Sequence, residues 1–381
     1  MSESTLNGKS SKVSLKNMLL VGGAFSSYTI GSGFATGAEV LQFFGSWGLG
    51  ADLLGVAVFF IITVYFTQSV YKTGHDYQFS NFMEIYEHYF GKVGARIIDI
   101  LIVVIVFAFC TSMFAGCGAT INQYFGLPVY VGAVLLGAAS AFVACLGLKK
   151  LIDTLGVIGV AIIVSVVLIG LYAAVVATQS LADSQANVLT YVEDGKVLQA
   201  GVFGMYNSVL AAVNYAGVLL ITGFGFYVSL GKDLHNRKEA FTSGIFSAVF
   251  FTAGMLLVLV AILFNLDYIV ESGAQVPNLA VLQNIAPALE PAFAVVLILG
   301  IFTTITGYLW LLAGRFAKER TLKSTLIIIG LTVLGVFGGA IIPFNTLVNI
   351  VYPYSGLFGM VVFIAIIIRD IRGNKKGAAK E

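Results

Sequence analysis

The chain has 381 residues, of which 58% are hydrophobic and only 10% charged, whereas charged residues make up about a quarter of a soluble globular domain. This composition excludes a water-soluble enzyme and indicates a bilayer protein. The net charge of +2 is too small for a nucleic-acid-binding surface.

Apolar runs separated by polar breaks predict an all-α membrane protein, because a spanning helix needs about 20 apolar residues. Ten transmembrane helices are expected, at 15–44, 49–71, 94–122, 127–147, 151–177, 198–230, 238–264, 288–315, 322–342 and 346–369. Residues 1–14 and 372–381 are polar tails, and residues 178–197 form a long loop between the two sets of five helices.

The basic residues predict the orientation of these helices. Twenty of the 21 Lys and Arg residues fall on one side of the predicted arrangement, and only Lys196 falls on the other. Cytoplasmic loops are the ones enriched in Lys and Arg. Both termini are therefore expected in the cytoplasm, and the loop 178–197 outside the cell.

The number of helices on each side of that loop predicts an inverted repeat. Each set has five spans, so 15–177 and 198–371 must cross the membrane in opposite orientations. Short helices are also expected at matching positions, at 79–90 inside and at 277–285 outside, the second with Pro277 in its first turn. The alternative is that both are ordinary amphipathic loop helices.

Two predicted spans are too long for one straight helix. The span 15–44 has about thirty residues, or about 45 Å of helix, against a hydrocarbon thickness of about 30 Å. Its centre carries glycines at positions 31, 33 and 37, and each weakens a helix by about 1 kcal/mol. The span 198–230 places Asn207 and Asn214 at membrane depth. We expect both helices to break, although Gly33-x-x-x-Gly37 also fits close helix packing.

Interrupted helices at matching places in two inverted halves indicate the solute site of a transporter. Free N–H groups after the first break suit a carboxylate, and free carbonyls before it suit a cation or ammonium, so the pair predicts a zwitterion. The candidate solute-binding residues are Gly31, Gly33, Phe34, Ala35, Thr36, Thr111, Phe114, Asn207, Asn214 and Tyr215. Tyr352 and Tyr354 are further aromatic candidates.

Glu39 is the one carboxylate well inside a predicted span. An ionised glutamate in hydrocarbon is costly, so it must face a cavity, pair with another group or stay protonated. Two roles follow as hypotheses, a proton carrier or a partner for a solute amine. The alternative is a protonated side chain that bonds to Gln42 or to a neighbouring helix.

The chain resembles a known fold. Two inverted sets of five spans, with breaks in 15–44 and 198–230, resemble the LeuT-like fold of the amino acid-polyamine-organocation superfamily. The string Ile30-Gly31-Ser32-Gly33-Phe34-Ala35-Thr36-Gly37-Ala38-Glu39 is similar to the first helix of the YkvI-like membrane proteins, which implies a bacterial inner membrane. Gly37 stands where the neurotransmitter symporters have Arg, so their outer ion-pair gate is not expected. The Asp-Pro-Gly and Met-Pro-His motifs of the metal transporters do not occur.

The resemblance also implies an ion site and an activity. Na⁺ would bind the carbonyls of Ser27 and Ile30 and the hydroxyls of Thr303 and Thr304, as a hard cation prefers oxygen ligands; the alternative is that these threonines bond to their own helix. The implied function is a cation-coupled secondary transporter, Na⁺ favoured and H⁺ possible, for a small amino acid or related zwitterion. The other candidate is a membrane receptor of the same fold. Neither needs a catalytic residue or a cofactor beyond bound Na⁺, and the expected partners are the solute and the lipid bilayer.

Overall fold

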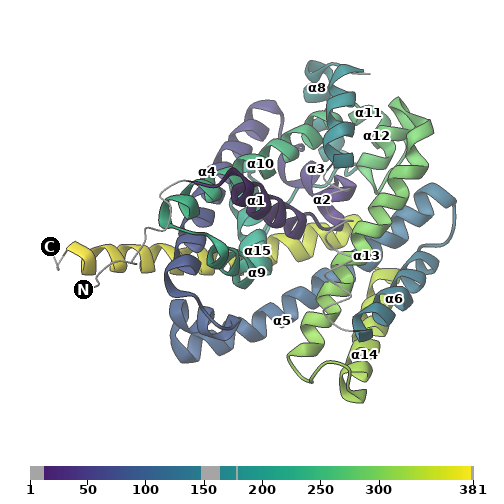
Figure 1. Cartoon of the computed structure of the whole chain (residues 1–381). Helices are drawn as coiled ribbons and strands as arrows, with labels where there is room; N and C mark the ends of the chain where they lie inside the picture. The colour runs from purple at the N-terminus through teal and green to yellow at the C-terminus, as the bar shows by residue number, and fades with distance from the viewer. Residues whose placement is uncertain (1–12, 147–163, 177–178, 379–381) are drawn as a thin grey trace, which may run out of the picture.

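The computed structural model describes residues 13–146, 164–176 and 179–378, and within these ranges the chain is a bundle of helices without a named β-strand (Figure 1). Eight of the described helices are long and apolar enough to cross a membrane. They are α4 (Leu49–Tyr77), α5 (Phe82–Phe125), α6 (Val129–Leu146), α9 (Ser208–Leu230), α10 (Arg237–Leu263), α13 (Glu290–Gly314), α14 (Leu322–Ile341) and α15 (Phe344–Ala378). The prediction of an all-α, multi-pass membrane protein is confirmed.

The other two predicted spans differ from a single long helix. Residues 15–44 form three helices, α1 (Leu15–Thr29), α2 (Ser32–Thr36) and α3 (Ala38–Phe44). Of the span predicted at 151–177, an apolar helix over Val164–Val175 is described, and the start of that span lies outside the described residues. The count of ten spans stays a prediction.

Two glycines fix where the first segment is interrupted. Ile30 and Gly31 have extended backbone angles and separate α1 from α2, and Gly37 separates α2 from α3. Gly37 has φ = 85°, a left-handed conformation that is costly for residues with a Cβ. The side chain of Asn278 lies against this glycine and donates a 2.9 Å hydrogen bond to the Ala35 carbonyl. The bend is therefore held from outside the segment as well.

The predicted interruption in the middle of the helix 198–230 is wrong, because the helix begins later than predicted and has no break. α9 is continuous from Ser208 to Leu230, and the residues before it are not helical. Asn207 is the cap of α9, because its side chain accepts hydrogen bonds from the N–H groups of Val209 and Leu210. Asn214 lies inside the helix.

Gly217, in the same stretch, allows α9 to pack closely against α15. A Cβ on Gly217 would overlap the backbone of Gly356 in α15, and a Cβ on Gly356 would overlap the Asn214 carbonyl. Small residues allow such a close approach of two helix backbones in a membrane. The cost of glycine within α9 is thus offset by contact with α15, and the helix stays intact.

Both predicted short helices are present. The first, residues 82–90, is separated from the rest of α5 by Gly91, which has φ = 70°. The second is α12 (Pro277–Ile285), which contacts α11 (Leu266–Glu271), and α11 contacts α8 (Leu181–Glu193) at one end of the bundle (Figure 1). Two 3-10 turns, η1 (Gly231–Asp233) and η2 (Pro287–Leu289), complete the described elements.

The helices pack as two groups. In the first group, α1 and α4 each contact α9 and α10. In the second group, α5, α6, α13 and α14 contact one another, and α6, α13 and α14 lie together at the lower right of Figure 1. α15 contacts both α9 and α5, and α2 contacts α5, α12 and α13. The interrupted segment therefore lies where the two groups meet. The inverted relation between 15–177 and 198–371 stays a prediction.

Candidate functional site

A small cavity opens at the interruption between α1 and α2. Its volume is ≈ 20 Å³, which is room for about one water molecule. Six helices contribute to its wall, together with the bend itself. The lining residues are Tyr28, Thr29, Gly31, Glu39, Phe109, Met113, Val218, Leu219, Thr222, Tyr308 and Tyr352.

Glu39 is the centre of this site. Its side chain is only 4% exposed, and its carboxylate accepts a 2.7 Å hydrogen bond from the hydroxyl of Tyr215. The Tyr352 hydroxyl and the N–H of Phe34 also donate to it. Hydrogen bonds to an ionised acceptor are among the strongest in proteins. One carboxylate on α3 thus joins α2, α9 and α15.

Gly33 makes room for that carboxylate. A Cβ on Gly33 would overlap the Oε1, Cδ and Cγ atoms of Glu39. Its neighbour Thr36 donates a 3.0 Å hydrogen bond to the Gly33 carbonyl and accepts one of 3.4 Å from the N–H of Ala38. Both residues therefore support the bend and the position of Glu39, and neither side chain lines the cavity.

The place predicted for a solute carboxylate is taken by Glu39. The Phe34 N–H donates to the Glu39 carboxylate, and the Ala35 N–H bonds to the Gly31 carbonyl at 3.0 Å. The ring of Phe34 lies away from the cavity and packs on Phe251, at 5.1 Å between ring centroids. Of the predicted solute-binding residues, Gly31 lines the cavity and Tyr215 reaches it through Glu39.

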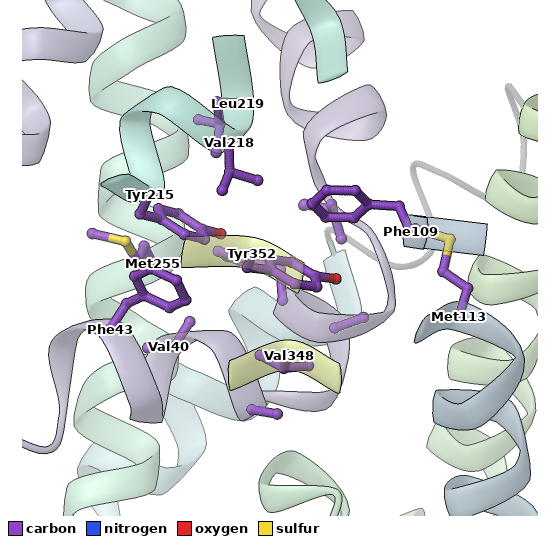
Figure 2. Close-up of a cluster of buried hydrophobic side chains, with 14 of the residues drawn as sticks. Val40, Phe43, Phe109, Met113, Tyr215, Val218, Leu219, Met255, Val348 and Tyr352 are labelled. Carbon is purple, nitrogen blue, oxygen red and sulfur yellow. The ribbon is translucent and has the colours of Figure 1, made fainter. Parts of the chain in front are cut away.

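Aromatic side chains form much of the wall. The rings of Phe109 and Tyr352 lie 4.4 Å apart between centroids, and Figure 2 shows Tyr352 between Tyr215 and Phe109. Tyr28 donates a 2.8 Å hydrogen bond to the Thr222 carbonyl of α9. Among the described lining residues, Glu39 is the only one with a formal charge. The cavity wall therefore combines aromatic rings, hydroxyl groups and apolar side chains around one carboxyl group.

The carbonyls proposed for Na⁺ are those that lose their helical partners. In a continuous helix the Gly31 N–H would bond to Ser27 and the Phe34 N–H to Ile30. Here the Gly31 N–H bonds to the Thr29 carbonyl at 3.0 Å, and the Phe34 N–H bonds to Glu39. Oxygen atoms released in this way suit a hard cation.

The two threonines proposed for Na⁺ bond to their own helix in this conformation. The hydroxyls of Thr303 and Thr304 donate to the same carbonyl, that of Gly300, at 2.8 and 3.1 Å. Their helix α13 packs against α2. These bonds to the Gly300 carbonyl are the ones that the alternative interpretation predicts.

Four predicted residues lie elsewhere. Thr111 and Phe114 of α5 lie against glycines 335 and 339 of α14, so they are packing residues. Asn207 is exposed at the cap of α9, and Asn214 faces the packed glycines of α15. The cavity-facing residues of α5 are Phe109 and Met113.

Several lining residues were missed by the sequence analysis. Tyr28 and Thr29 come directly before the predicted break, so their position in the chain could have identified them. Tyr308 is one helical turn after Thr304, on the same face of α13. Tyr352 was among the aromatic candidates, and the structure brings it to Glu39.

Hydrogen bonds close one end of the bundle above the site. The side chain of Asn349 donates to Gln42 Oε1 at 3.2 Å and to the Gln199 carbonyl at 2.7 Å. Gln199 donates to the Ser46 carbonyl at 2.6 Å, and the Ala200 N–H bonds to the Gln42 carbonyl at 3.0 Å. α3, α15 and the loop before α9 are thereby joined by neutral groups at this end, which we call the Gln42 end.

The opposite end is closed by a buried carboxylate. Glu239 of α10 accepts hydrogen bonds from the Ser14 N–H at 3.0 Å and from the Asn17 side chain at 3.2 Å. The N–H of His235 donates to the same carboxylate at 2.7 Å. These bonds fasten the start of α1 to α10. In the second group of helices, Arg315 of α13 pairs with Asp99 of α5.

Comparison with known proteins identifies the fold. No protein-family model matches the chain. It is 26% identical to the Bacillus subtilis (strain 168) protein YyaD over 369 residues, which cover 94% of this chain and 98% of YyaD. It is 20% identical to the membrane protein YkvI of the same organism over 344 residues, or 89% of this chain and 92% of YkvI. Neither name states an activity.

Three solved structures share its architecture. MhsT in complex with L-phenylalanine matches with a TM-score of 0.58 and 15% identity, over 93% of this chain and 88% of MhsT. A manganese transporter of Eremococcus coleocola matches at 0.57 and 13%, over 96% and 83%. A Na⁺-coupled sialic acid symporter matches at 0.52 and 12%, over 93% and 94%. The chain has the LeuT fold that its sequence resembles.

Proposed function

We propose that this protein is a secondary transporter that moves a small amino-containing solute by alternating access, coupled to Na⁺. The observation that carries the proposal is Glu39, a buried carboxylate on an interrupted segment at the contact between two groups of helices. An ionisable group at this depth is costly, and such groups in membrane proteins mark solute or ion pathways. The transporters of the same fold support the assignment.

The hydrogen bonds at both ends of the bundle support alternating access. The Gln42 end is held by amide hydrogen bonds and the opposite end by Glu239. Transport would open these closures in turn. With both termini in the cytoplasm, as the basic residues predict, the Gln42 end faces outward. H⁺ is the second candidate for the coupling ion.

The test is uptake of radiolabelled solutes into proteoliposomes with an imposed Na⁺ gradient. Accumulation that collapses when the gradient is abolished supports the proposal. A solute that binds to the purified protein without accumulation under any gradient would instead support a receptor. Both outcomes are read on the same preparation.

One variant and a matched control test the proposed Na⁺ site. Thr303→Ala removes a proposed Na⁺ ligand and should raise the Na⁺ concentration for half-maximal uptake by about tenfold, the effect of losing about 1.4 kcal/mol of binding. Thr306 also bonds to its own helix, at 2.6 Å from the Phe302 carbonyl, so Thr306→Ala is the matched control. An equal Na⁺ dependence in both variants would remove Thr303 from the site.

A further inference from the structure

We propose that the solute is a small organic ammonium ion without a carboxylate, whose cationic head binds Glu39 within the aromatic wall of the cavity. This inference rests on the proposed function and replaces the zwitterion expected from the sequence. It follows from the charge of the cavity, from the groups that Glu39 already occupies, and from the chemistry of the remaining wall.

The charge of the site favours a cation. Among the cavity-lining residues that the structure describes, Glu39 alone is formally charged, and none of them is Lys, Arg or His. Glu39 is buried, so its field is weakly screened by solvent. A solute ammonium would be attracted, whereas a solute carboxylate would meet a like charge that only the proposed Na⁺ could offset.

The donors that a solute carboxylate needs are already used. The Phe34 N–H and the hydroxyls of Tyr215 and Tyr352 all donate to Glu39. The Ala35 N–H bonds to the backbone, and the Tyr28 hydroxyl to the Thr222 carbonyl. A second carboxylate would have to displace Glu39 from its donors, whereas an ammonium is itself a donor and can bind the Glu39 carboxylate directly.

The aromatic wall suits the same head group. Rings of Tyr28, Phe109, Tyr308 and Tyr352 line the cavity, and aromatic faces attract ammonium groups, most strongly where water is excluded. Met113, Val218 and Leu219 supply an apolar surface for the rest of the solute. The ≈ 20 Å³ cavity is the closed form, and it must widen when the solute enters.

The experiment compares matched pairs in which one member lacks the carboxylate of the other. Thermal unfolding of the purified full-length protein is recorded with phenethylamine against L-phenylalanine, isobutylamine against L-valine, and choline against glycine betaine. A ligand raises the unfolding temperature according to its affinity and concentration. We expect at least one amine to bind about tenfold or more tightly than its partner, since opposed like charges are strongly unfavourable.

Variants separate the charge from the fold. Glu39→Gln keeps the size of the side chain and an acceptor oxygen but removes the charge, and should weaken amine binding by about tenfold or more. Phe109→Leu should weaken choline binding by about threefold to tenfold. Glu193→Gln removes an exposed carboxylate at the end of α8 and serves as the control that leaves binding unchanged.

Three results would overturn the proposal: carboxylate partners that bind as tightly as the amines in all three pairs, full amine binding by Glu39→Gln, or no binding by any of the three amines. The proposed transport function has a separate readout. Amine binding without uptake into proteoliposomes would contradict the transport proposal and leave the solute class intact. Uptake of an amino acid but not of its amine would support the transport proposal and contradict the proposed solute class.

Discussion

Gly33→Ala is the substitution that tests the arrangement around Glu39 most directly. The added methyl group would overlap the Glu39 carboxylate, so either the carboxylate or the bend must move. Alanine is otherwise the better helix former, by about 1 kcal/mol, and Gly33 lies within the helix α2. Helix propensity alone therefore predicts stabilisation, and the packing against Glu39 predicts the reverse.

The expected size follows from the bonds at risk. The carboxylate accepts from Tyr215 at 2.7 Å, and also from Tyr352 and the Phe34 N–H. A hydrogen bond to a charged group contributes about 1.5–3 kcal/mol. If the methyl group breaks two of them, and helix propensity returns about 1 kcal/mol, the net loss is about 2–5 kcal/mol.

The assay is thermal and denaturant unfolding of purified protein, with Gly23→Ala as the control. Gly23 lies within α1 and a Cβ there has no neighbour within 4 Å, so that variant should be neutral or slightly stabilised. Gly33→Ala should unfold several degrees lower than the parent protein. It should also lose solute binding, because Glu39 no longer has its position.

A double-mutant cycle isolates the cause. In a Glu39→Ala background the overlap is absent, so adding Gly33→Ala should cost little, with a coupling of about 1–3 kcal/mol between the two sites. If Gly33→Ala destabilises the protein equally in both backgrounds, the overlap with Glu39 is not the reason. The interpretation of Gly33 would then be refuted.

Three further substitutions test the ends and the packing. Asn349→Ala removes two hydrogen bonds at the Gln42 end and should increase amide hydrogen exchange in α3; unchanged exchange would contradict its closing role. Glu239→Gln takes the charge from a carboxylate that fastens α1 and should speed proteolysis near the start of α1, with equal cleavage as the contrary result. Gly356→Ala would push against the Asn214 carbonyl of α9 and should destabilise the protein by about 1–3 kcal/mol; an unchanged unfolding temperature would contradict the close packing.

The first interruption could be predicted because its causes are local. Gly37 permits a left-handed backbone conformation that other residues avoid, and the segment is longer than the hydrocarbon thickness. The continuous α9 could not be predicted, because the glycine at 217 is explained by Gly356, more than a hundred residues away. A glycine-containing stretch has the same local composition whether it breaks its helix or packs against another helix.

The orientation of α5 about its own axis explains why two predicted site residues do not line the cavity. A helix that is apolar on all sides has no amphipathic pattern to show which face meets the core. Thr111 and Phe114 were therefore chosen by depth, yet they face α14. Phe109 and Met113, less than one turn away, face the cavity. Glu39 was identified because its charge makes its position exceptional whichever way the helix is turned.

The hydrogen bonds of Glu39 also link solute binding to movement of the helices. Tyr215 and Tyr352 belong to α9 and α15, whose backbones meet at Gly217 and Gly356, so these two helices should move as one unit. A ligand shifts a conformational equilibrium only by its different affinity for the two states. An ammonium that competes with the tyrosine hydroxyls for the carboxylate would weaken the bond between α3 and the unit of α9 and α15. Binding at Glu39 would then release the segment whose movement opens the site, which joins recognition of the solute to the conformational change.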